Sequence, residues 1–269
     1  MIVRPVAAVL EREVLKLFRQ RGRLLAAMVR PLLWLLVIGA GFAAIQERQG
    51  AADYQSFLVP GVLGMTLLFG AMLAALSTVY DKESGVLRML VIAPIRHFWI
   101  VLAKALGATL AATLQALMLL ALLALLGYVS REVSIPLLAV GIVSTAFACA
   151  SLGMLIAASA RGIENFATLM NFVIFPVFFL SGSLYPVQQL PAPLQMVASL
   201  NPYTYGVDLL KHARVAGPAV AFSPDFSVGV DLAVLIAFSA AALAVASLRF
   251  SRDAAHEPLV RSLARSRAE

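Results

Sequence analysis

The chain has 269 residues, of which 61% are hydrophobic and 13% are charged, and its mean hydropathy is +0.91. These values exclude an ordinary globular or disordered protein and place the chain among membrane proteins. The net charge of +7 would also suit a nucleic-acid-binding protein. The basic residues are spread over many segments, however, so we predict no nucleic-acid partner. The one cysteine, Cys149, excludes a disulfide within the chain.

Residues 1–27 predict a cytoplasmic amphipathic helix on the membrane surface. Between residues 5 and 23, apolar side chains recur at helical spacing with basic side chains between them. Such a helix binds membrane lipids, because its apolar face enters the acyl boundary while its basic face meets the headgroups. Charged residues continue as far as Arg30, so we predict no cleavable signal peptide. The apolar positions are Val6, Leu10, Val14, Leu17 and Phe18, and the basic ones are Arg12, Lys16 and Arg19.

Residues 28–250 contain six apolar segments near the length of about 20 residues that a membrane-spanning helix needs. The pattern predicts an all-α polytopic membrane protein with six transmembrane helices. The predicted spans are Met28–Ile45, Phe57–Val79, Leu106–Leu126, Ile135–Ser159, Phe166–Leu184 and Val228–Leu248.

The basic residues predict the orientation of these spans. With both termini in the cytoplasm, 17 of the 21 Lys and Arg residues lie on the cytoplasmic side, including those of a basic tail at residues 251–269. This distribution satisfies the positive-inside rule. We therefore expect a multi-pass protein of the cell membrane, a bacterial inner membrane, with both termini cytoplasmic.

The cytoplasmic loop at residues 80–97 mixes charged and apolar residues. Asp81, Lys82, Glu83 and Arg88 alternate with Val86, Leu87, Leu90 and Val91 before Pro94 ends the segment. This predicts a short amphipathic helix whose apolar residues insert into a partner. The alternative is a plain cytoplasmic loop with basic residues that reach the headgroups.

The segment at residues 181–210 begins as a continuation of the fifth span. It is then interrupted by Gly182, Pro186, Pro191, Pro193 and Pro202, yet its first charge is Asp208. Irregular backbone at membrane depth is tolerated only where protein or water satisfies its polar groups. The segment therefore predicts an external re-entrant helical hairpin between spans five and six. Its tyrosines at positions 185, 203 and 205 suggest an aromatic belt at the headgroups.

The chain has no motif for chemistry of its own. It contains no G-x-x-x-x-G-K-[ST], no G-x-S-x-G and no H-E-x-x-H, and its three histidines are scattered. We predict no catalytic residue, no metal site and no cofactor bound by this chain. The spans are also nearly free of the ionisable residues that ion-coupled carriers use. Lys104 is expected to reach the inner surface, and Asp231 lies within a turn of the outer one.

Four stretches resemble the membrane subunit of ABC-2 type exporters, which handle drugs, nodulation factors and polysaccharides. They are DKESGVLRMLVIAPI at 81–95, FPVFFLSGSLYP at 175–186, LPAPLQ at 190–195 and NPYTYGVDLLK at 201–211. In that family the first loop is a coupling helix that docks in a separate ATP-binding subunit. The resemblance thus implies coupling residues Glu83, Gly85, Leu87, Arg88, Leu90 and Pro94. It also implies a second role for the N-terminal helix, in contact with the same subunit.

The resemblance further implies a homodimer of this chain with two ATP-binding subunits, which hold ATP and Mg²⁺. The substrate path would then lie at the dimer interface. Candidate path residues are Thr109, Thr113, Gln115, Asn171, Phe172 and Phe175, although such residues also commonly bond neighbouring helices or face lipid. Candidate residues of the external segment are Gly182, Tyr185, Pro186, Asn201, Pro202, Tyr203 and Tyr205.

The function expected from these features is that of a non-catalytic permease subunit of an ATP-driven exporter. The substrate would be amphipathic or lipid-linked, either a drug-like molecule or a glycoconjugate. A non-transporting membrane anchor that recruits a cytoplasmic partner is an alternative. An ion-coupled secondary carrier is a further one.

Overall fold

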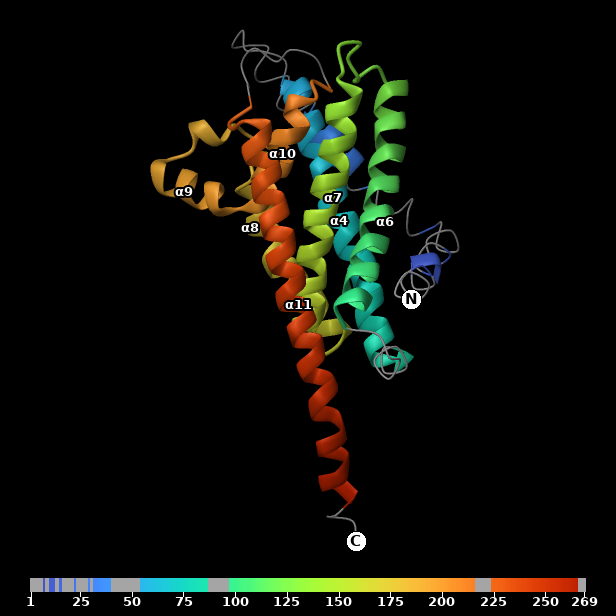
Figure 1. Ribbon diagram of the computed structural model, residues 1–269. Helices are drawn as coiled ribbons and strands as arrows, with labels where there is room; N and C mark the ends of the chain where they lie inside the picture. The colour runs from blue at the N-terminus through green and yellow to red at the C-terminus, as the bar shows by residue number, and fades with distance from the viewer. Residues whose placement is uncertain are drawn as a thin grey trace.

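A computed structural model describes residues 7, 10–12, 15, 22, 29, 31–39, 54–86, 97–215 and 224–265. All regular structure in these residues is helical, so the all-α prediction is confirmed for them. Figure 1 shows long helices packed side by side, with the last one extending well beyond the others. The long helices are α4 (Tyr54–Glu83), α6 (His97–Leu125), α7 (Ile135–Ser159), α8 (Ile163–Phe179) and α11 (Val228–Arg265).

Four of these helices, α4, α6, α7 and α11, are long and apolar enough to cross a membrane. They correspond to the second, third, fourth and sixth predicted spans. The protein is therefore a multi-pass membrane protein. Of the first predicted span, Met28–Ile45, residues 29 and 31–39 are described, and they include the π-helix η1 (Trp34–Gly39).

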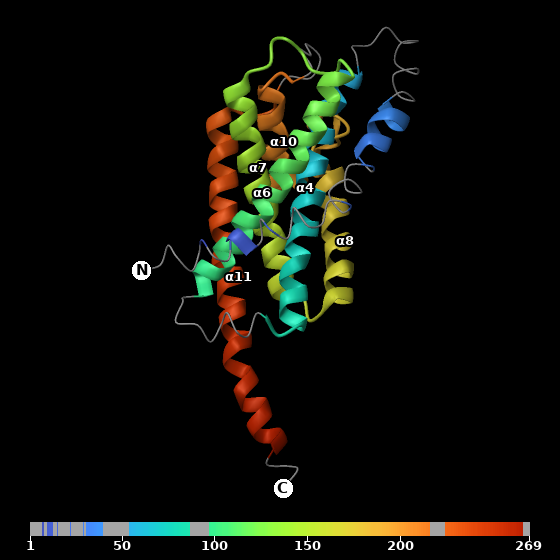
Figure 2. The ribbon, with the colours of Figure 1, turned by 90° about the vertical axis from the view of Figure 1, so that its right-hand side faces the viewer.

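Helix α4 is the centre of the bundle. Within its most apolar window 83% of the residues are buried, against 28% for α11, and it contacts η1, α6, α7, α8 and α10. Figure 2 shows α8 at one edge of the bundle and α11 at the other. The large apolar core lies around α4, and its fully buried side chains include Leu63, Leu67, Leu68 and Met72.

The bundle has two distinct ends, because its long helices alternate in direction. One end is where α4 finishes and α6 begins, and we call it the Asp81 end. The opposite end is where α6 finishes, α7 begins and α10 leads into α11, and we call it the Asp208 end.

The fifth predicted span is shorter than expected, because α8 stops at Phe179 rather than at Leu184. Gly182 has a φ of +75°, in the left-handed region that interrupts a helix and that glycine adopts at little cost. With 17 residues, α8 is about 25 Å long at 1.5 Å per residue. That is less than the hydrocarbon thickness of about 30 Å.

Three short helices follow α8: η2 (Val187–Gln189), α9 (Ala192–Leu200) and α10 (Pro202–His212). Helix α9 projects to the side of the bundle (Figure 1) and exposes most of its residues. Helix α10 instead packs against α7, α11 and α4, and all its residues from Tyr203 to Leu210 are buried. The segment after α8 therefore leaves the bundle and then re-enters its packed part.

Candidate functional site

The Asp81 end is held together by one buried carboxylate. Asp81 lies in the last turn of α4 and is 5% exposed. Its Oδ1 accepts from Arg12 at 2.9 Å, and its Oδ2 accepts from the Lys104 ammonium of α6 at 2.6 Å. The contacts join the N-terminal segment, α4 and α6. We call these three residues the Asp81 junction.

The junction corrects one expectation about Lys104. We expected its ammonium to reach the inner surface, but Lys104 is buried and paired with Asp81. Burying a charge in an apolar bundle is costly unless an opposite charge accompanies it. Helix α6 can therefore begin at His97, earlier than the predicted Leu106, because the charge of Lys104 is matched by a carboxylate of α4.

The residues after Asp81 attach α4 to the turn between α7 and α8. Lys82 Nζ donates to the carbonyl of Ala160 at 3.2 Å, and Glu83 Oε1 accepts from the backbone N–H of Ile163 at 2.8 Å. The latter contact caps the N-terminus of α8, where a negative charge is favourable. Gly162, just before α8, offers no side chain for this purpose.

The predicted coupling residues are thus only partly placed by the structure. Glu83 has the intramolecular capping role just described. Gly85 follows it with a φ of +76°, in a conformation that suits glycine at the point where the chain leaves α4. The other four predicted coupling residues, Leu87, Arg88, Leu90 and Pro94, lie outside the described residues.

The predicted path residues do not form one surface in a single chain. Thr109 and Gln115 are buried between α6 and its neighbours, and the Thr109 hydroxyl donates to the Ala105 carbonyl of its own helix. Thr113 is half-buried. Asn171, Phe172 and Phe175 instead lie on an exposed face of α8, where Phe172 is 78% exposed.

The end of α8 is satisfied by side chains of the external segment. The last carbonyls of a helix have no partner within it. Here the Val177 carbonyl accepts from Asn201 Nδ2 at 2.7 Å and the Phe178 carbonyl from the Ser181 hydroxyl at 2.7 Å. The Phe179 carbonyl accepts from the Tyr185 hydroxyl. These contacts explain how the helix can stop inside an apolar sequence.

Residues 201–205, the N-P-Y-T-Y motif, bond the last carbonyls of α9 in the same way. The Ala198 carbonyl accepts from the Thr204 hydroxyl at 2.8 Å, and the Ser199 carbonyl from the Tyr205 hydroxyl at 2.7 Å. Asn201 also begins α10, since its Oδ1 accepts from the N–H of Tyr203 at 3.1 Å, with Pro202 in the first helical position. The asparagine, threonine and second tyrosine of N-P-Y-T-Y thus bond the broken backbone.

The aromatic-belt prediction is wrong for Tyr203 and Tyr205. Both are buried, with exposures of 3% and 8%, so neither can face lipid headgroups. The Tyr203 ring packs beside Gly64 of α4. Tyr185 is half-buried, and Pro186 is buried just before η2. The external segment is therefore predominantly a packing and hydrogen-bonding element in this chain.

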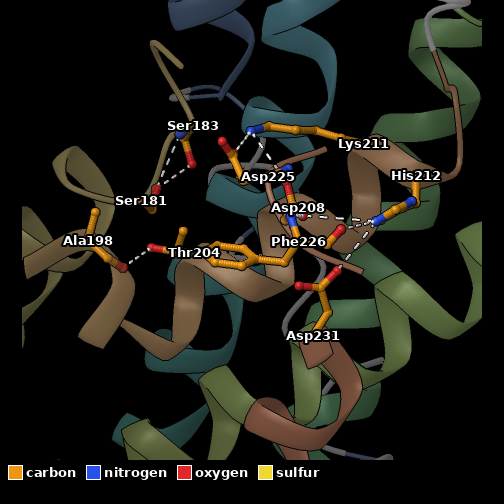
Figure 3. Close-up of polar contacts among 10 residues, drawn as sticks. All are labelled: Ser181, Ser183, Ala198, Thr204, Asp208, Lys211, His212, Asp225, Phe226 and Asp231. Carbon is orange, nitrogen blue, oxygen red and sulfur yellow. Dashed lines mark hydrogen bonds and ion pairs between the residues drawn. The ribbon is translucent and has the colours of Figure 1, made fainter. Parts of the chain in front are cut away.

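A group of charged side chains occupies the Asp208 end (Figure 3). It comprises Asp208, Lys211 and His212 of α10, Asp225 before α11, and Asp231 in the first turn of α11. We call these five residues the Asp208 cluster. Figure 3 shows the side chains converging between the end of α10 and the start of α11.

Asp208 is the best-bonded member of the Asp208 cluster. Its two oxygens accept from the backbone N–H groups of Asp225 at 2.8 Å and Phe226 at 2.9 Å, and Lys211 Nζ lies 3.7 Å from Oδ1. Burial raises the pKa of Asp208, whereas these N–H groups and the ammonium oppose the shift. Lys211 also donates to Asp225 Oδ2 at 3.1 Å.

Sequence reasoning identified Asp208 only as the first charge after a long apolar stretch. Its hydrogen-bond partners are 17 and 18 residues away, beyond any local helical spacing. Both donors to Asp208 are backbone N–H groups, and residue types do not reveal which backbone groups will donate. The one available signal was the presence of Asp231 inside an apolar span.

The fold and these sites are those of a multi-pass membrane protein, with a charged junction at one end and a broken, internally bonded segment at the other. The chain belongs to the ABC-2 type transporter family, whose sequence profile matches residues 4–213. The resemblance seen in the four sequence stretches is thereby confirmed.

Individual relatives agree with this assignment. The chain is 29% identical to Nodulation protein J of Rhizobium leguminosarum bv. trifolii over 202 residues, which cover 73% of this chain and 76% of the relative. It is 28% identical over 217 residues to the putative transport permease ycf38 of Porphyra purpurea, with coverages of 78% and 74%. For ycf38 of Cyanophora paradoxa the identity is 27% over 252 residues, with coverages of 88% and 85%.

Proposed function

We propose that this chain is the permease subunit of an ATP-driven exporter, which moves an amphipathic or lipid-linked molecule out of the cytoplasm or the inner leaflet. Two copies would pair with two ATP-binding subunits. The ATP and Mg²⁺ would be held by those subunits, since the sequence of this chain has no phosphate-binding loop. The family and its transport permeases support the class of function.

The proposed orientation has the Asp81 end in the cytoplasm. The support is the charge distribution, with 17 of 21 basic residues on that side. In this arrangement residues 28–45 and α8 complete six spans in a bacterial inner membrane. Residues 181–210 form a re-entrant segment at the outer side, where the bonded carbonyls of α8 and α9 remove the cost of a broken backbone.

The observation that carries the proposal is the Asp81 junction. The coupling loop at 80–97 connects the end of α4 to the start of α6, and Asp81 joins those two helix ends to Arg12 of the N-terminal segment. A push on the loop by a closing ATP-binding subunit would therefore move α4, α6 and the N-terminal helix together. Switches of this type depend on packed elements that move as units.

The exposed face of α8 supports a path between two copies. It carries Asn171 beside Phe172 and Phe175, which are 78% and 56% exposed. A polar amide is costly against lipid tails, and in membrane proteins such residues face a partner helix or a water-filled cavity. A second copy and an amphipathic substrate would together cover both the amide and the rings.

The test is reconstitution of the chain with the ATP-binding subunit that copurifies with it. Proteoliposomes would be assayed for ATP-dependent movement of an amphipathic dye and of a fluorescent lipid-linked oligosaccharide. We expect transport of at least one probe, and loss of transport with retained membrane insertion for Leu87→Asp. Copurification without any ATP-dependent movement would favour the anchor alternative. Transport driven by an ion gradient in this chain alone would overturn the proposal.

A further inference from the structure

Three side chains with metal-binding atoms meet at the Asp208 end. Asp208, His212 and Asp231 each offer one ligand atom, and these atoms lie within 4.8 Å of one another. His212 Nε2 is 3.9 Å from Asp208 Oδ2 and 3.7 Å from Asp231 Oδ2. Figure 3 shows the imidazole beside the two carboxylates, one from α10 and one from α11, with a dashed line to each.

Asp231 is the member of the Asp208 cluster whose burial is not explained by hydrogen bonds. It is 0% exposed, and neither carboxylate oxygen takes part in a hydrogen bond in the described part of the chain. A buried carboxylate is expected to be hydrogen-bonded, paired or bound to a metal. Its Oδ2 faces His212, with no backbone donor of the kind that Asp208 has.

The net charge of the Asp208 cluster also favours a bound cation. Its five side chains comprise three carboxylates and one ammonium, with the imidazole neutral when it acts as a ligand. The excess is two negative charges in a group whose carboxylates are almost completely buried. A divalent cation would match this excess, whereas Lys211 is already engaged with Asp225 and Asp208.

We propose that Asp208, His212 and Asp231 bind one divalent cation of the zinc class, which fastens the end of α10 to the start of α11. An imidazole nitrogen with carboxylate oxygens suits Zn²⁺, whereas Mg²⁺ and Ca²⁺ prefer oxygen ligands alone. Ligand atoms around tetrahedral zinc lie about 3.4 Å apart, given bonds of about 2.0–2.1 Å. The two distances from His212 Nε2, 3.7 and 3.9 Å, need to shorten by less than about 0.6 Å, and the two carboxylate oxygens, within 4.8 Å of each other, would also have to close around the ion.

The surroundings fit this site in two further respects. The backbone N–H groups that bond Asp208 would hold that ligand in place, as outer partners do in metal sites. His212 Nε2 is within hydrogen-bond distance of the Phe226 carbonyl oxygen, at 2.9 Å, so a cation on Nε2 would replace the proton that this nitrogen donates, with the carbonyl oxygen as a further ligand. The His212 side chain is 22% exposed, which gives a cation access from solvent. The site does not depend on the proposed export function.

The experiment uses the full-length chain in detergent, stripped of metal with EDTA. Zn²⁺ binding is measured by titration calorimetry, and Co²⁺ is added to record its visible absorption, which reports nitrogen and oxygen coordination. We expect one Zn²⁺ per chain and a higher Tm with Zn²⁺ but not with Mg²⁺. Asp231→Asn and His212→Ala should each weaken zinc binding by at least about 100-fold, since outer partners alone account for 10–100-fold.

Two control variants distinguish this site from incidental binding. Glu132→Gln removes an exposed carboxylate outside the Asp208 cluster, in the turn between α6 and α7 at the same end, and His97→Ala removes a histidine at the other end of the bundle. Both should bind Zn²⁺ within about threefold of the parent. The Tm of each variant in EDTA establishes that it is folded.

Three results would overturn the proposal. One is Zn²⁺ binding that survives both Asp231→Asn and His212→Ala in folded protein. Another is a Tm that rises equally with Mg²⁺. The third is the absence of any Zn²⁺ binding by the metal-free chain. In that case protonation of the carboxylates, rather than a bound cation, would balance the charge of the Asp208 cluster.

Discussion

At the scale of single residues, the Asp81 carboxylate is bonded on both oxygens, by Arg12 and by Lys104. Lys104 is only 2% exposed at its side chain, whereas Arg12 is 39% exposed. The contact with Lys104 is therefore the one that water cannot replace. A buried ion pair contributes little by comparison with an apolar pair of the same size, but removing one partner strands the other charge.

We therefore predict that Asp81→Asn destabilises the chain by about 3 kcal/mol, because it removes the carboxylate that the buried Lys104 ammonium contacts at 2.6 Å. The double variant Asp81→Asn with Lys104→Met should recover most of this loss, since no charge is then stranded. Thermal unfolding in detergent, followed by tryptophan fluorescence, measures both. Glu83→Gln, at an exposed position two residues away, should cost no more than about 1 kcal/mol. A double variant that is less stable than Asp81→Asn would contradict this account.

At the scale of elements, the small residues of α4 set how closely other helices approach it. The Cβ of an alanine at position 64 would lie 2.7 Å from the Tyr203 hydroxyl and 3.1 Å from a methyl group of Val207. At position 61 it would lie 2.0 Å from the Ser183 carbonyl oxygen. Small residues on a membrane helix can serve contacts within one chain or between two. These two glycines accommodate the external segment and α10 of the same chain.

Gly64→Ala should consequently destabilise the chain by about 1–3 kcal/mol, although alanine is the better helix former by about 1 kcal/mol. Tyr203→Phe should partly restore stability in the Gly64→Ala background, because it removes the hydroxyl that the new methyl group meets. Among the residues that the structure describes, that hydroxyl has no partner within hydrogen-bond distance, so its loss costs little. Denaturant unfolding in detergent is the measurement. The control is Gly229→Ala, which has nothing within 4 Å of the added atom and should be neutral or slightly stabilising. If Gly229→Ala lowers the free energy of unfolding as much as Gly64→Ala does, the packing explanation is wrong.

The junction between α9 and α10 provides a second test at this scale. Asn201 accepts from the Tyr203 N–H and donates to the Val177 carbonyl. Aspartate is an equally good N-terminal cap, but it cannot donate and would face a carbonyl oxygen. We predict that Asn201→Asp loses about 1–3 kcal/mol and is no more stable than Asn201→Ala. The same change at Asn165, whose oxygen accepts from the Arg161 N–H at an exposed position, should be nearly neutral. If Asn201→Asp melts at the parental temperature, the bond to Val177 does not contribute.

How far these elements can be predicted from sequence depends on what marks their ends. Both ends of α7 were predicted at Ile135 and Ser159, because Pro136 and a polar turn bound an apolar run. The start of α6 was missed, since Lys104 reads as a surface residue unless its partner on α4 is known. The end of α8 was missed because the carbonyl-bonding residues, such as Asn201, follow it by many positions. Asp208, Lys211 and His212 share a face of α10 by helical spacing, but Asp225 and Asp231 could not be predicted to join them, since only tertiary contacts bring these two residues close.

At the scale of the whole molecule, the bundle is covered unevenly. Helix α4 is enclosed by neighbours, while α8 at the edge leaves one continuous face open (Figure 2). Along α8 that face includes Asn165, Thr168, Asn171, Phe172 and Phe175, so it is polar near the Asp81 end and aromatic toward the other. Lipid tails suit the aromatic half but not the amide and hydroxyl groups. The face of α11 also exposes large side chains, among them Ile236 at 65% and Leu248 at 65%, but these are purely apolar.

The contrast between these two faces leads to a prediction about assembly. In a background in which Cys149 is replaced by alanine, the chain has no other cysteine. Phe172→Cys should then form a covalent dimer in native membranes on treatment with a short bifunctional thiol reagent, because α8 of one copy would face α8 of another. Ile236→Cys, comparably exposed on α11, should remain monomeric because that face meets lipid. Gel mobility with and without the reagent measures both.

Dimers formed equally at both positions would indicate collision in the membrane, and dimers at Ile236 alone would move the proposed path away from α8. Dimers confined to Phe172 would instead place Asn171 at the contact between copies, where a polar amide among aromatic rings could contact an amphipathic substrate.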